Sequence, residues 1–550
     1  MKLKALLAVL LLSTLLFSCE NKSEIPDVII PPPPPPPPIT GTYYVDPSGS
    51  NSNDGSIDSP FATLAYACAQ VTTVGNIIHL NAGTFNETVE SELHEGVSIE
   101  GEGNTSIVKS SVDGNTSTLS LYSGSESITP QHISNVKFDG NNLTAYRAIY
   151  VGKRSNVEIN NCTFINFNYY GISFYGGGTG EDQPTTWSYG NKVHDCIITN
   201  CSAWVGAKNG GEGKGSITID GTEACEIYNN TITQKGRSGY MNGYLIKCVG
   251  GWNKGLKIYN NIMDKEPVTT SNEDLVYDFA IEIWQGLGGL EIYNNQITGG
   301  SIDLSGDGGN TKGTYEFAAW IHHNSIGSQS LSNSDNPVGI LFEVGCQDII
   351  VEYNHIYNVS EGIWMPIYDN IVTKTNHYDI KNMTIRYNIF DNMKTSGIDC
   401  LNTTTSSTST YDGFYVYNNV IVAAPGYTTW GIKLPYVQIL SNVYIRNNII
   451  TNFGTTPIRA FGDGMTVNNM YITNNIFFNN GNSNDPYFSI TPTQYTYSSN
   501  IKTDPKFISS TNFHLQSVSP AINAGYNVGL TLDYDKHHIS NPPEIGVYEY

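Results

Sequence analysis

Short stretches in which apolar and polar residues alternate recur along most of the chain, and each is interrupted by one or two asparagines. The copies include "LEIYNNQI" (290–297), "LKIYNNIM" (256–263), "CEIYNNTI" (225–232), "FYVYNNVI" (414–421), "VYIRNNII" (443–450) and "MYITNNIF" (470–477). Alternation with a period of two indicates β-strands, whose successive side chains point to opposite faces. Each copy therefore predicts a strand, a polar corner and a second short strand.

The copies return at a nearly regular spacing of 27 to 35 residues. The residues aligned at the corner are Asn161, Asp195, Asn230, Asn261, Asn295, Asn324, Asn354, Asn388, Asn419, Asn448 and Asn475. Further strands of the form Gly-Ile-x, such as "GISFY" and "GIDCL", follow the corners. Three short strands per repeat, without a helical period or a leucine-rich-repeat signature, predict an all-β parallel β-helix of about eleven or more coils.

The corner asparagines need an explanation, because asparagine is depleted from strands. Asparagine tolerates left-handed backbone dihedrals, and its amide can hydrogen-bond the equivalent amide one coil above and below. We therefore expect an asparagine ladder through the corners. Asp195 should be its weakest rung, because an ionised carboxylate accepts hydrogen bonds but cannot donate them.

This pattern resembles the right-handed parallel β-helix proteins of the pectate-lyase-like superfamily over residues 76–500. The stretch "TYYVDPSGSNSNDGSIDSPFATLAYACAQV" (42–71) is similar to the start of many exported members. Within residues 41–75 we expect a capping helix, with Ser59 as N-cap and Pro60 at its first position, whose apolar side chains cover the end of the coil stack. These side chains are Phe61, Leu64, Cys68 and Val71. The closing "PPEIGVYEY" resembles the ends of bacterial surface β-helix proteins, so we expect residues 501–550 to form a C-terminal capping segment.

Residues 1–18 read as a signal peptide, because Lys2 and Lys4 precede an apolar run too short to span a bilayer. The sequence "LFSC" that ends at Cys19 resembles the bacterial lipobox, which implies lipidation of that cysteine. The linker over residues 19–40 contains eight consecutive prolines and should be stiff and extended. We expect a lipoprotein of the cell envelope, anchored to a bacterial outer membrane only through its N-terminal lipid.

The charge and the cysteines exclude some functions. The net charge of −22 becomes −24 when Lys2 and Lys4 are removed, which disfavours nucleic acid as a partner. The eight cysteines after Cys19 show no CxxC spacing, so a zinc site is not expected; a Cys196–Cys201 disulfide is left open. We expect a monomer whose partner is a polysaccharide.

The loop lengths predict where that polysaccharide would bind. We counted the residues from each corner to the outward-pointing residue of the Gly-Ile-x strand that follows it. This separation is 23 residues for Thr218, 17 for Lys247 and 21 for Glu282. Insertions on one corner of neighbouring coils mark the binding face of a solenoid. Lys247, Glu282 and Asp303 should lie beneath them on successive coils, about 5 Å apart.

Four more residues should extend this groove as substrate-binding residues: Trp284, Glu343, Trp364 and Asp399. Large exposed rings serve as platforms for sugars. A purely structural alternative also exists, because Lys, Glu and Asp on neighbouring strands form favourable charge pairs in any exposed sheet.

The resemblance implies three functional hypotheses. The first is a polysaccharide lyase that cleaves a uronate-containing glycan by β-elimination, with Lys247 as the base. Two neighbouring carboxylates would raise the pKa of Lys247, so this hypothesis also requires calcium, held by Glu282 and Asp303, to offset that rise. The alternatives are a glycoside hydrolase that uses Glu282 and Asp303, and a noncatalytic glycan-binding surface lipoprotein. Calcium is the candidate cofactor of the lyase hypothesis alone.

Overall fold

The computed structural model divides the chain into residues 1–39 and 40–550, and the residues that it describes lie in the second unit. They are 41–177, 184–203, 214–235, 242–248, 252–265, 279–284, 286–305, 317–329, 331, 338–343, 346–365, 380–400, 410–426, 430–434, 437, 439–460, 466–481, 483–488, 492 and 494–550. The expected signal peptide, Cys19 and the proline-rich linker lie outside the described residues.

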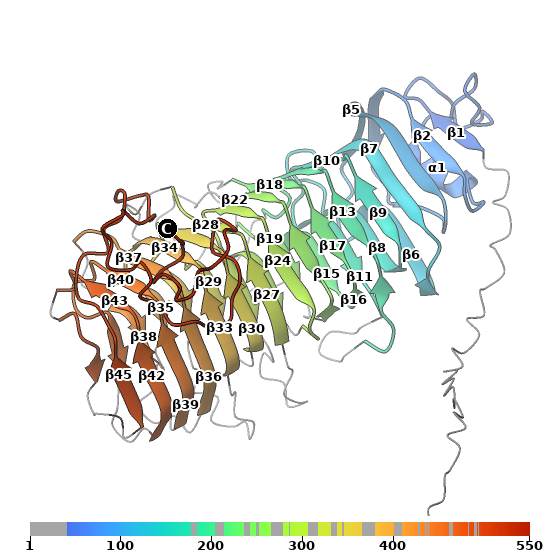
Figure 1. Ribbon diagram of the computed structural model, residues 1–550. Coiled ribbons are helices and arrows are strands. Elements are labelled where there is room, and N and C mark those ends of the chain that lie inside the picture. The colour runs from blue at the N-terminus through green and yellow to red at the C-terminus, as the bar shows by residue number, and fades with distance from the viewer. Residues whose placement is uncertain are drawn as a thin grey trace, which may run out of the picture. The chain divides into compact units, whose positions relative to one another are not determined.

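The described strands form three parallel sheets, which confirms the predicted parallel β-helix (Figure 1). The Gly-Ile-x strands build a 14-stranded sheet, and the strands on both sides of the asparagine corner build a 28-stranded one. In both sheets a strand pairs with the equivalent strand one coil further along the chain, as β23 does with β26. Every coil therefore depends on its neighbours for its hydrogen bonds.

The 14-stranded sheet consists of β4 (Ser91–Glu92), β6 (Ser117–Ser127), β8 (Arg147–Arg154), β11 (Tyr170–Tyr175), β15 (Gly215–Asp220), β19 (Tyr244–Cys248), β23 (Phe279–Trp284), β26 (Ser301–Ser305), β29 (Ile340–Phe342), β32 (Glu361–Trp364), β35 (Ser396–Asp399), β38 (Trp430–Lys433), β41 (Ile458–Ala460) and β44 (Tyr487–Phe488). The three-stranded sheet consists of β12 (Ser188–Tyr189), β16 (Thr222–Glu223) and β20 (Asn253–Lys254).

The 28-stranded sheet consists of β1 (Thr42–Val45), β2 (Ile77–Leu80), β3 (Gly83–Glu87), β5 (Ser98–Ser110), β7 (Gln131–Asp139), β9 (Val157–Asn160), β10 (Thr163–Ile165), β13 (Lys192–His194), β14 (Ile197–Thr199), β17 (Glu226–Tyr228), β18 (Thr231–Gln234), β21 (Lys257–Tyr259), β22 (Ile262–Lys265), β24 (Leu290–Tyr293), β25 (Gln296–Thr298), β27 (Phe317–His322), β28 (Ser325–Gly327), β30 (Cys346–Glu352), β31 (His355–Tyr357), β33 (Ile380–Arg386), β34 (Ile389–Met393), β36 (Thr410–Tyr417), β37 (Val420–Ala423), β39 (Ile439–Arg446), β40 (Ile449–Thr451), β42 (Thr466–Thr473), β43 (Ile476–Phe478) and β45 (Tyr495–Ser498).

The core lies inside the coils and consists of columns of stacked aliphatic side chains. Ile281, Ile302, Ile340 and Ile363 occupy the same register position on four successive strands of the 14-stranded sheet, and all are fully buried. Burial of each such side chain contributes about 1.5–3 kcal/mol. Because the isoleucine of each Gly-Ile-x strand points inward, the residue that follows it must point outward.

Two adjacent asparagines at a corner have different roles. The first, Asn294, takes the left-handed conformation with φ of 53°. The second, Asn295, is buried: its Oδ1 accepts hydrogen bonds from the backbone N and the Nδ2 of Asn261, and its Nδ2 donates to Oδ1 of Asn324, all at 3.0 Å. The ladder continues without a break through Asn230, Asn261, Asn295, Asn324, Asn354, Asn388, Asn419, Asn448, Asn475 and Asn500.

The prediction that Asn161 and Asp195 are rungs of this ladder is wrong by one residue. Both are exposed and take the left-handed conformation, with φ of 52° and 54°. The rung position in their coils is held by Cys162 and Cys196, whose thiols donate to carbonyl groups of the preceding coil. The sequence does not show which of the two corner positions Asn161 and Asp195 fill, because asparagine and aspartate suit the left-handed conformation as well as the ladder.

The capping helix exists but begins later than predicted. Helix α1 (Leu64–Gln70) has Thr63 as its N-cap, and not Ser59. The reason is that Phe61 is extended and forms a bridge to β1, so the helix cannot begin before it. Leu64 and Cys68 are buried as expected. No described helix has the length and apolar character needed to cross a bilayer.

The C-terminal segment packs against the outer side of the last coils. Its Phe513, Leu515 and Ile545 form a second apolar cluster with Ile449 and Ile476, whose side chains point away from the main core. None of the eight cysteines of the described region is in a disulfide and all are buried, so Cys196 and Cys201 are not linked. The cysteines are therefore core residues of the coils.

Candidate functional site

One row of outward-facing side chains runs along the 14-stranded sheet, and we call it the outer row. Lys247 pairs in register with Glu282, and Glu282 pairs with Asp303, as predicted. The complete row is Glu92, Ser120, Tyr150, Ser173, Thr218, Lys247, Glu282, Asp303, Leu341, Trp364, Asp399, Lys433, Arg459 and Tyr487. Counting along the Gly-Ile-x strands thus placed these side chains correctly.

The expectation that this part of the row is exposed is wrong. Lys247, Glu282 and Asp303 keep only 5, 4 and 0% of their accessible surface, and Trp284 and Trp364 are half-buried. Lys247 forms an ion pair with Glu282 and packs against the rings of Tyr244 and Trp284 instead of extending into solvent. The site is therefore a low-dielectric environment, in which charges interact strongly.

The ammonium group of Lys247 is held by three neighbours. It forms a buried ion pair with the carboxylate of Glu282. Its Nζ also lies 4.5 Å from the ring centre of Trp284 and 4.7 Å from that of Tyr244. A carboxylate and two aromatic faces are favourable neighbours for an ammonium group. Lys247 thus holds Glu282 in position.

Asp303 is in the opposite situation. Neither of its carboxylate oxygens has a hydrogen-bond partner among the described residues. Burial raises the pKa of Asp303 well above its usual value, and the negative charges of Glu343 and Glu282 raise it further. The indole N–H of Trp284 opposes this rise in pKa without reaching hydrogen-bond geometry. Asp303 is therefore a carboxyl group biased toward its protonated form.

Glu343 is the third carboxyl group of the site. Its backbone N–H donates to the carbonyl of Leu304 at 2.8 Å, which places it directly after β29 and beside Asp303. Burial raises the pKa of Glu343, and the charge of Glu282 adds to the rise. We call Lys247, Glu282, Trp284, Asp303 and Glu343 the acidic cluster. It combines two carboxyl groups that tend to keep their protons with one carboxylate that is paired to a cation.

The structure sets the other two predicted residues apart from this cluster. Trp364 and Asp399 lie three and four strands beyond Glu282 on the outer row, about 14 and 19 Å away. Asp399 forms its own buried ion pair with Lys433 and accepts a hydrogen bond from Ser396 Oγ at 3.1 Å. The row thus contains two separate pairs of a lysine and a carboxylate.

The acidic cluster does not fit calcium as it is arranged. Calcium needs six to eight oxygen ligands, but Glu282 is already bound to the ammonium group of Lys247, which would repel a second cation. Among the described residues no group of three or more histidines, cysteines, aspartates and glutamates has the geometry to hold a metal ion. Calcium at Glu282 and Asp303 therefore stays a hypothesis, and no chemical step is assigned to it.

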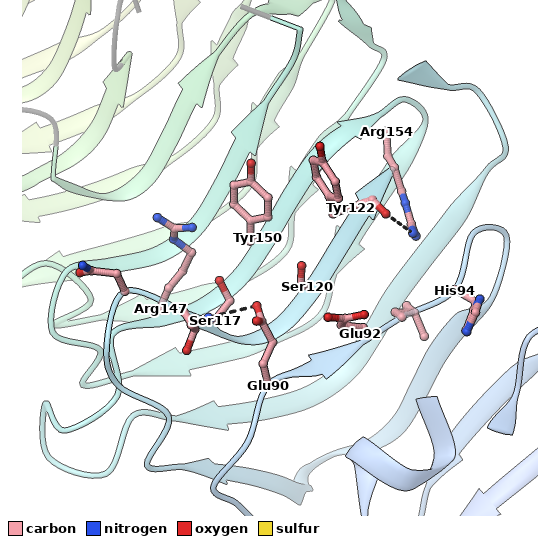
Figure 2. Close-up of a pocket in the computed structure, with 12 residues that line it drawn as sticks. Glu90, Glu92, His94, Ser117, Ser120, Tyr122, Arg147, Tyr150 and Arg154 are labelled. Atoms are coloured by element: carbon pink, nitrogen blue, oxygen red, sulfur yellow. Dashed lines mark hydrogen bonds between the residues drawn. The ribbon is translucent and has the colours of Figure 1, made fainter. Parts of the chain in front are cut away.

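A pocket of about 500 Å³ at the N-terminal end of the same sheet was missed by the sequence analysis. Figure 2 shows its lining, which includes Glu90, Glu92, Tyr122, Arg147 and Tyr150. The residues that line it, from Glu90 to Arg154, all precede Asn161, the first corner of the repeat alignment. The only signal was the density of tyrosines in "YRAIY" (146–150) and "YYGISFY" (169–175).

Comparisons with known proteins extend the description of the fold. No protein-family model matches the chain, and a search of curated proteins finds no similar sequence. Among solved structures, the chain is similar to a mutant tailspike protein of E. coli bacteriophage HK620, determined in complex with a pentasaccharide. The TM-score is 0.50 at 11% identity over 81% of this chain and 76% of that one.

Two lyases show weaker likeness. A PL6-family polysaccharide lyase from Pseudopedobacter saltans gives a TM-score of 0.44 at 12% identity, covering 88% of this chain and 98% of that one. An alginate lyase from Paenibacillus sp. gives 0.34 at 13% identity, covering 63% and 95%. At such identities only the likeness to the tailspike protein carries weight, and it shows the parallel β-helix fold alone.

Proposed function

We propose that this protein acts on carbohydrate and that the acidic cluster hydrolyses a glycosidic bond. The observation that carries the proposal is Asp303, a buried carboxyl group with a raised pKa and no hydrogen-bond partner among the described residues. Active sites that need both an acid and a base often hold one carboxyl group that keeps its proton next to a second one that is ionised. The tailspike protein of the same fold holds a pentasaccharide, which is in keeping with a glycan ligand.

In this proposal Asp303 is the general acid. Its protonated carboxyl group would donate a proton to the oxygen of the leaving sugar as the glycosidic C–O bond breaks. The carboxylate of Glu282 would either take a proton from the water that attacks the anomeric carbon, or attack that carbon itself to form an ester that water then hydrolyses. Lys247 orients Glu282 through their ion pair. Burial strengthens both effects, because few water molecules compete for the charges.

The structure gives less support to β-elimination, which was the first hypothesis from the sequence. That reaction needs Lys247 to reach and take a proton of the substrate, whereas its ammonium group is bound to Glu282 and packed against the rings of Tyr244 and Trp284. A noncatalytic glycan-binding role remains the third candidate, and the outer row with Trp364, together with the neighbouring Trp284, is the surface that it would use.

One assay distinguishes the three roles. The protein is incubated with a panel of neutral and uronate-containing polysaccharides, with and without calcium, and both reducing ends and ultraviolet absorbance of unsaturated products are followed. New reducing ends without unsaturated products support hydrolysis, and unsaturated products refute it in favour of elimination. Binding without either product indicates a noncatalytic protein.

Variants locate the reaction. Asp303→Asn and Glu282→Gln should each lower turnover by at least about a hundredfold, the scale of a lost acid–base group. Lys247→Ala should abolish an elimination reaction but only weaken hydrolysis. Glu291→Gln, in the 28-stranded sheet, is the control for loss of one carboxylate and should keep wild-type turnover. If the two cluster variants match this control on a polymer that the protein cleaves, the site lies elsewhere.

We also propose that the protein is a lipoprotein of the cell envelope, held to a bacterial outer membrane through a lipid on Cys19. The support is the sequence around that residue alone. A surface glycan would be within reach of such a protein, which agrees with the proposed activity.

A further inference from the structure

The N-terminal pocket lies on the same face as the acidic cluster but is separate from it. Tyr150 and Lys247 are three strands apart on the outer row, which corresponds to about 14 Å. Between them Ser173 and Thr218 are fully buried, and the Thr218 hydroxyl donates to Ser173 Oγ at 2.7 Å. No solvent-accessible side chain of the row connects the two places, so the pocket needs its own explanation.

Arg147 is the main polar group of the pocket that lacks a partner. No hydrogen bond or ion pair of its guanidinium group exists within the described part of the chain, and its Nε is buried without an acceptor. The group is held in place by aromatic rings instead, with its Cζ 4.6 to 6.0 Å from four ring centres. These rings belong to Tyr146, Tyr150, Tyr170 and Tyr175. A fixed guanidinium with unused donors, at the wall of a cavity, is suited to bind oxygen atoms of a ligand.

The second arginine of the pocket is already engaged. Arg154 donates to Ser123 Oγ, to Gln131 Oε1 and to the carbonyl of Tyr122, the last of which is drawn in Figure 2. It therefore holds the wall of the pocket together and offers little to a ligand. Its role is structural.

The charges in the pocket balance one another, which decides the class of ligand. Glu90 and Glu92 offset the two arginines, so an anion would find no excess of positive charge. Repulsion by Glu92 adds to the effect of burial in raising the pKa of Glu90. Hydroxyl groups, by contrast, can accept from Arg147 and donate to a carboxylate at the same time. Tyr122, which is 53% exposed, offers an aromatic face at the rim.

We propose that this pocket binds an uncharged sugar ring and is a second carbohydrate site, distinct from the acidic cluster. The ring stacks on Tyr122, and its hydroxyl groups bond to Arg147 and to Glu90 or Glu92. The volume of about 500 Å³ is within the range of small-ligand sites. The site requires no catalytic activity of the protein, and it would hold a long glycan at one end of the sheet.

Calorimetric titration tests the proposal on the full chain that carries Asp303→Asn, so that no sugar is cleaved during the measurement. The probes are the neutral oligosaccharides cellohexaose, xylohexaose and mannohexaose, and the acidic oligosaccharides hexagalacturonate and hexamannuronate. We expect at least one neutral probe to bind. Tyr122→Ala, Arg147→Gln and Glu92→Gln should each weaken that binding about tenfold or more, as for loss of a stacking ring or of a hydrogen bond to a charged group.

Two controls make the result specific. Tyr189→Ala removes a tyrosine of the same 53% exposure that does not line the pocket, and it should leave binding unchanged. Glu92→Gln changes an exposed side chain and keeps its shape, so its effect does not depend on the packing of the tyrosines around Arg147. The proposal is overturned if no neutral probe binds, if acidic probes bind more tightly, or if the three pocket variants behave like Tyr189→Ala. Because cleavage is not measured, these outcomes are independent of the proposed hydrolysis.

Discussion

Replacing Asn295 by alanine should destabilise the coils on both sides of it, and the structure indicates by how much. The side chain is 1% exposed; it accepts two hydrogen bonds from Asn261 and donates one to Asn324 and one to the carbonyl of Ile258 at 2.9 Å. Alanine removes all four bonds. The backbone N–H of Asn261 is left without its acceptor in a buried position, whereas Asn261 Nδ2 keeps its bond to the carbonyl of Ile227.

The expected loss follows from these groups. One orphaned buried donor costs about 1–3 kcal/mol, and each further bond lost costs about 0.5–1.5 kcal/mol, partly recovered by rearrangement. We therefore expect Asn295→Ala to lower the local stability by about 2–4 kcal/mol. Asn294→Ala is the matched control, because it changes the neighbouring asparagine, whose left-handed backbone costs alanine only about 1–2 kcal/mol.

Native-state hydrogen exchange is the suitable assay, since the stability of a solenoid is distributed over its repeats and a single unfolding transition is not assured. Exchange of amides in the coils of Asn261 and Asn295 should be accelerated in Asn295→Ala, and much less in Asn294→Ala. Amides near the N-terminal helix should be unaffected in both. If the two variants accelerate exchange equally, the ladder does not contribute the stability that its geometry indicates.

Three further predictions address the site and the location of the protein. Because burial raises the pKa of Asp303 in the folded state above the unfolded value of about 3.9, folding binds a proton and stability must fall as the pH rises from about 4 toward the folded pKa. Asp303→Asn should remove this dependence, so the free energy of unfolding of the variant, relative to that of the wild type, should be higher at pH 7 than at pH 4 in denaturant unfolding. An equal difference at the two pH values would contradict the raised pKa. Lys247→Met, which keeps the stem of the side chain, should leave Glu282 as an unpaired buried charge and cost about 3–5 kcal/mol in denaturant unfolding; a loss below about 1 kcal/mol would mean that the pair is solvated. Cys19→Ala should release the protein from membrane fractions, and retention after a salt wash would refute the lipid anchor.

The solenoid was predictable from the sequence because its cause is local. Each Gly-Ile-x strand must point its isoleucine into the coil, so the register from Lys247 to Asp399 followed from counting residues between the corners. The ladder was predicted correctly from Asn230 onward. It failed at Asn161, although Asn160 and Asn161 are adjacent, and at Asp195, because the sequence does not separate the backbone role of an asparagine or aspartate from its side-chain role.

The environment of the site was less predictable, since it depends on contacts between residues far apart in the sequence. The burial of Asp303 follows from packing among three strands, and the position of Trp284 over the ammonium group of Lys247 follows from a rotamer that no pattern encodes. The N-terminal pocket was not predicted from the sequence for the same reason. Glu90 precedes β4, whereas Ser117 and Arg147 begin β6 and β8; these segments share no motif, and only the folded sheet brings them together.

The asparagine ladder has a direction, and this gives the molecule an electrical polarity. In every rung from Asn230 to Asn475 the amide nitrogen donates to the oxygen of the next rung toward the C-terminus, so the amide dipoles are aligned head to tail along the solenoid axis. Aligned dipoles polarise one another, as they do along a helix. No single amide can then be reversed without opposing both of its neighbours, and removal of two adjacent rungs should cost less than twice the removal of one.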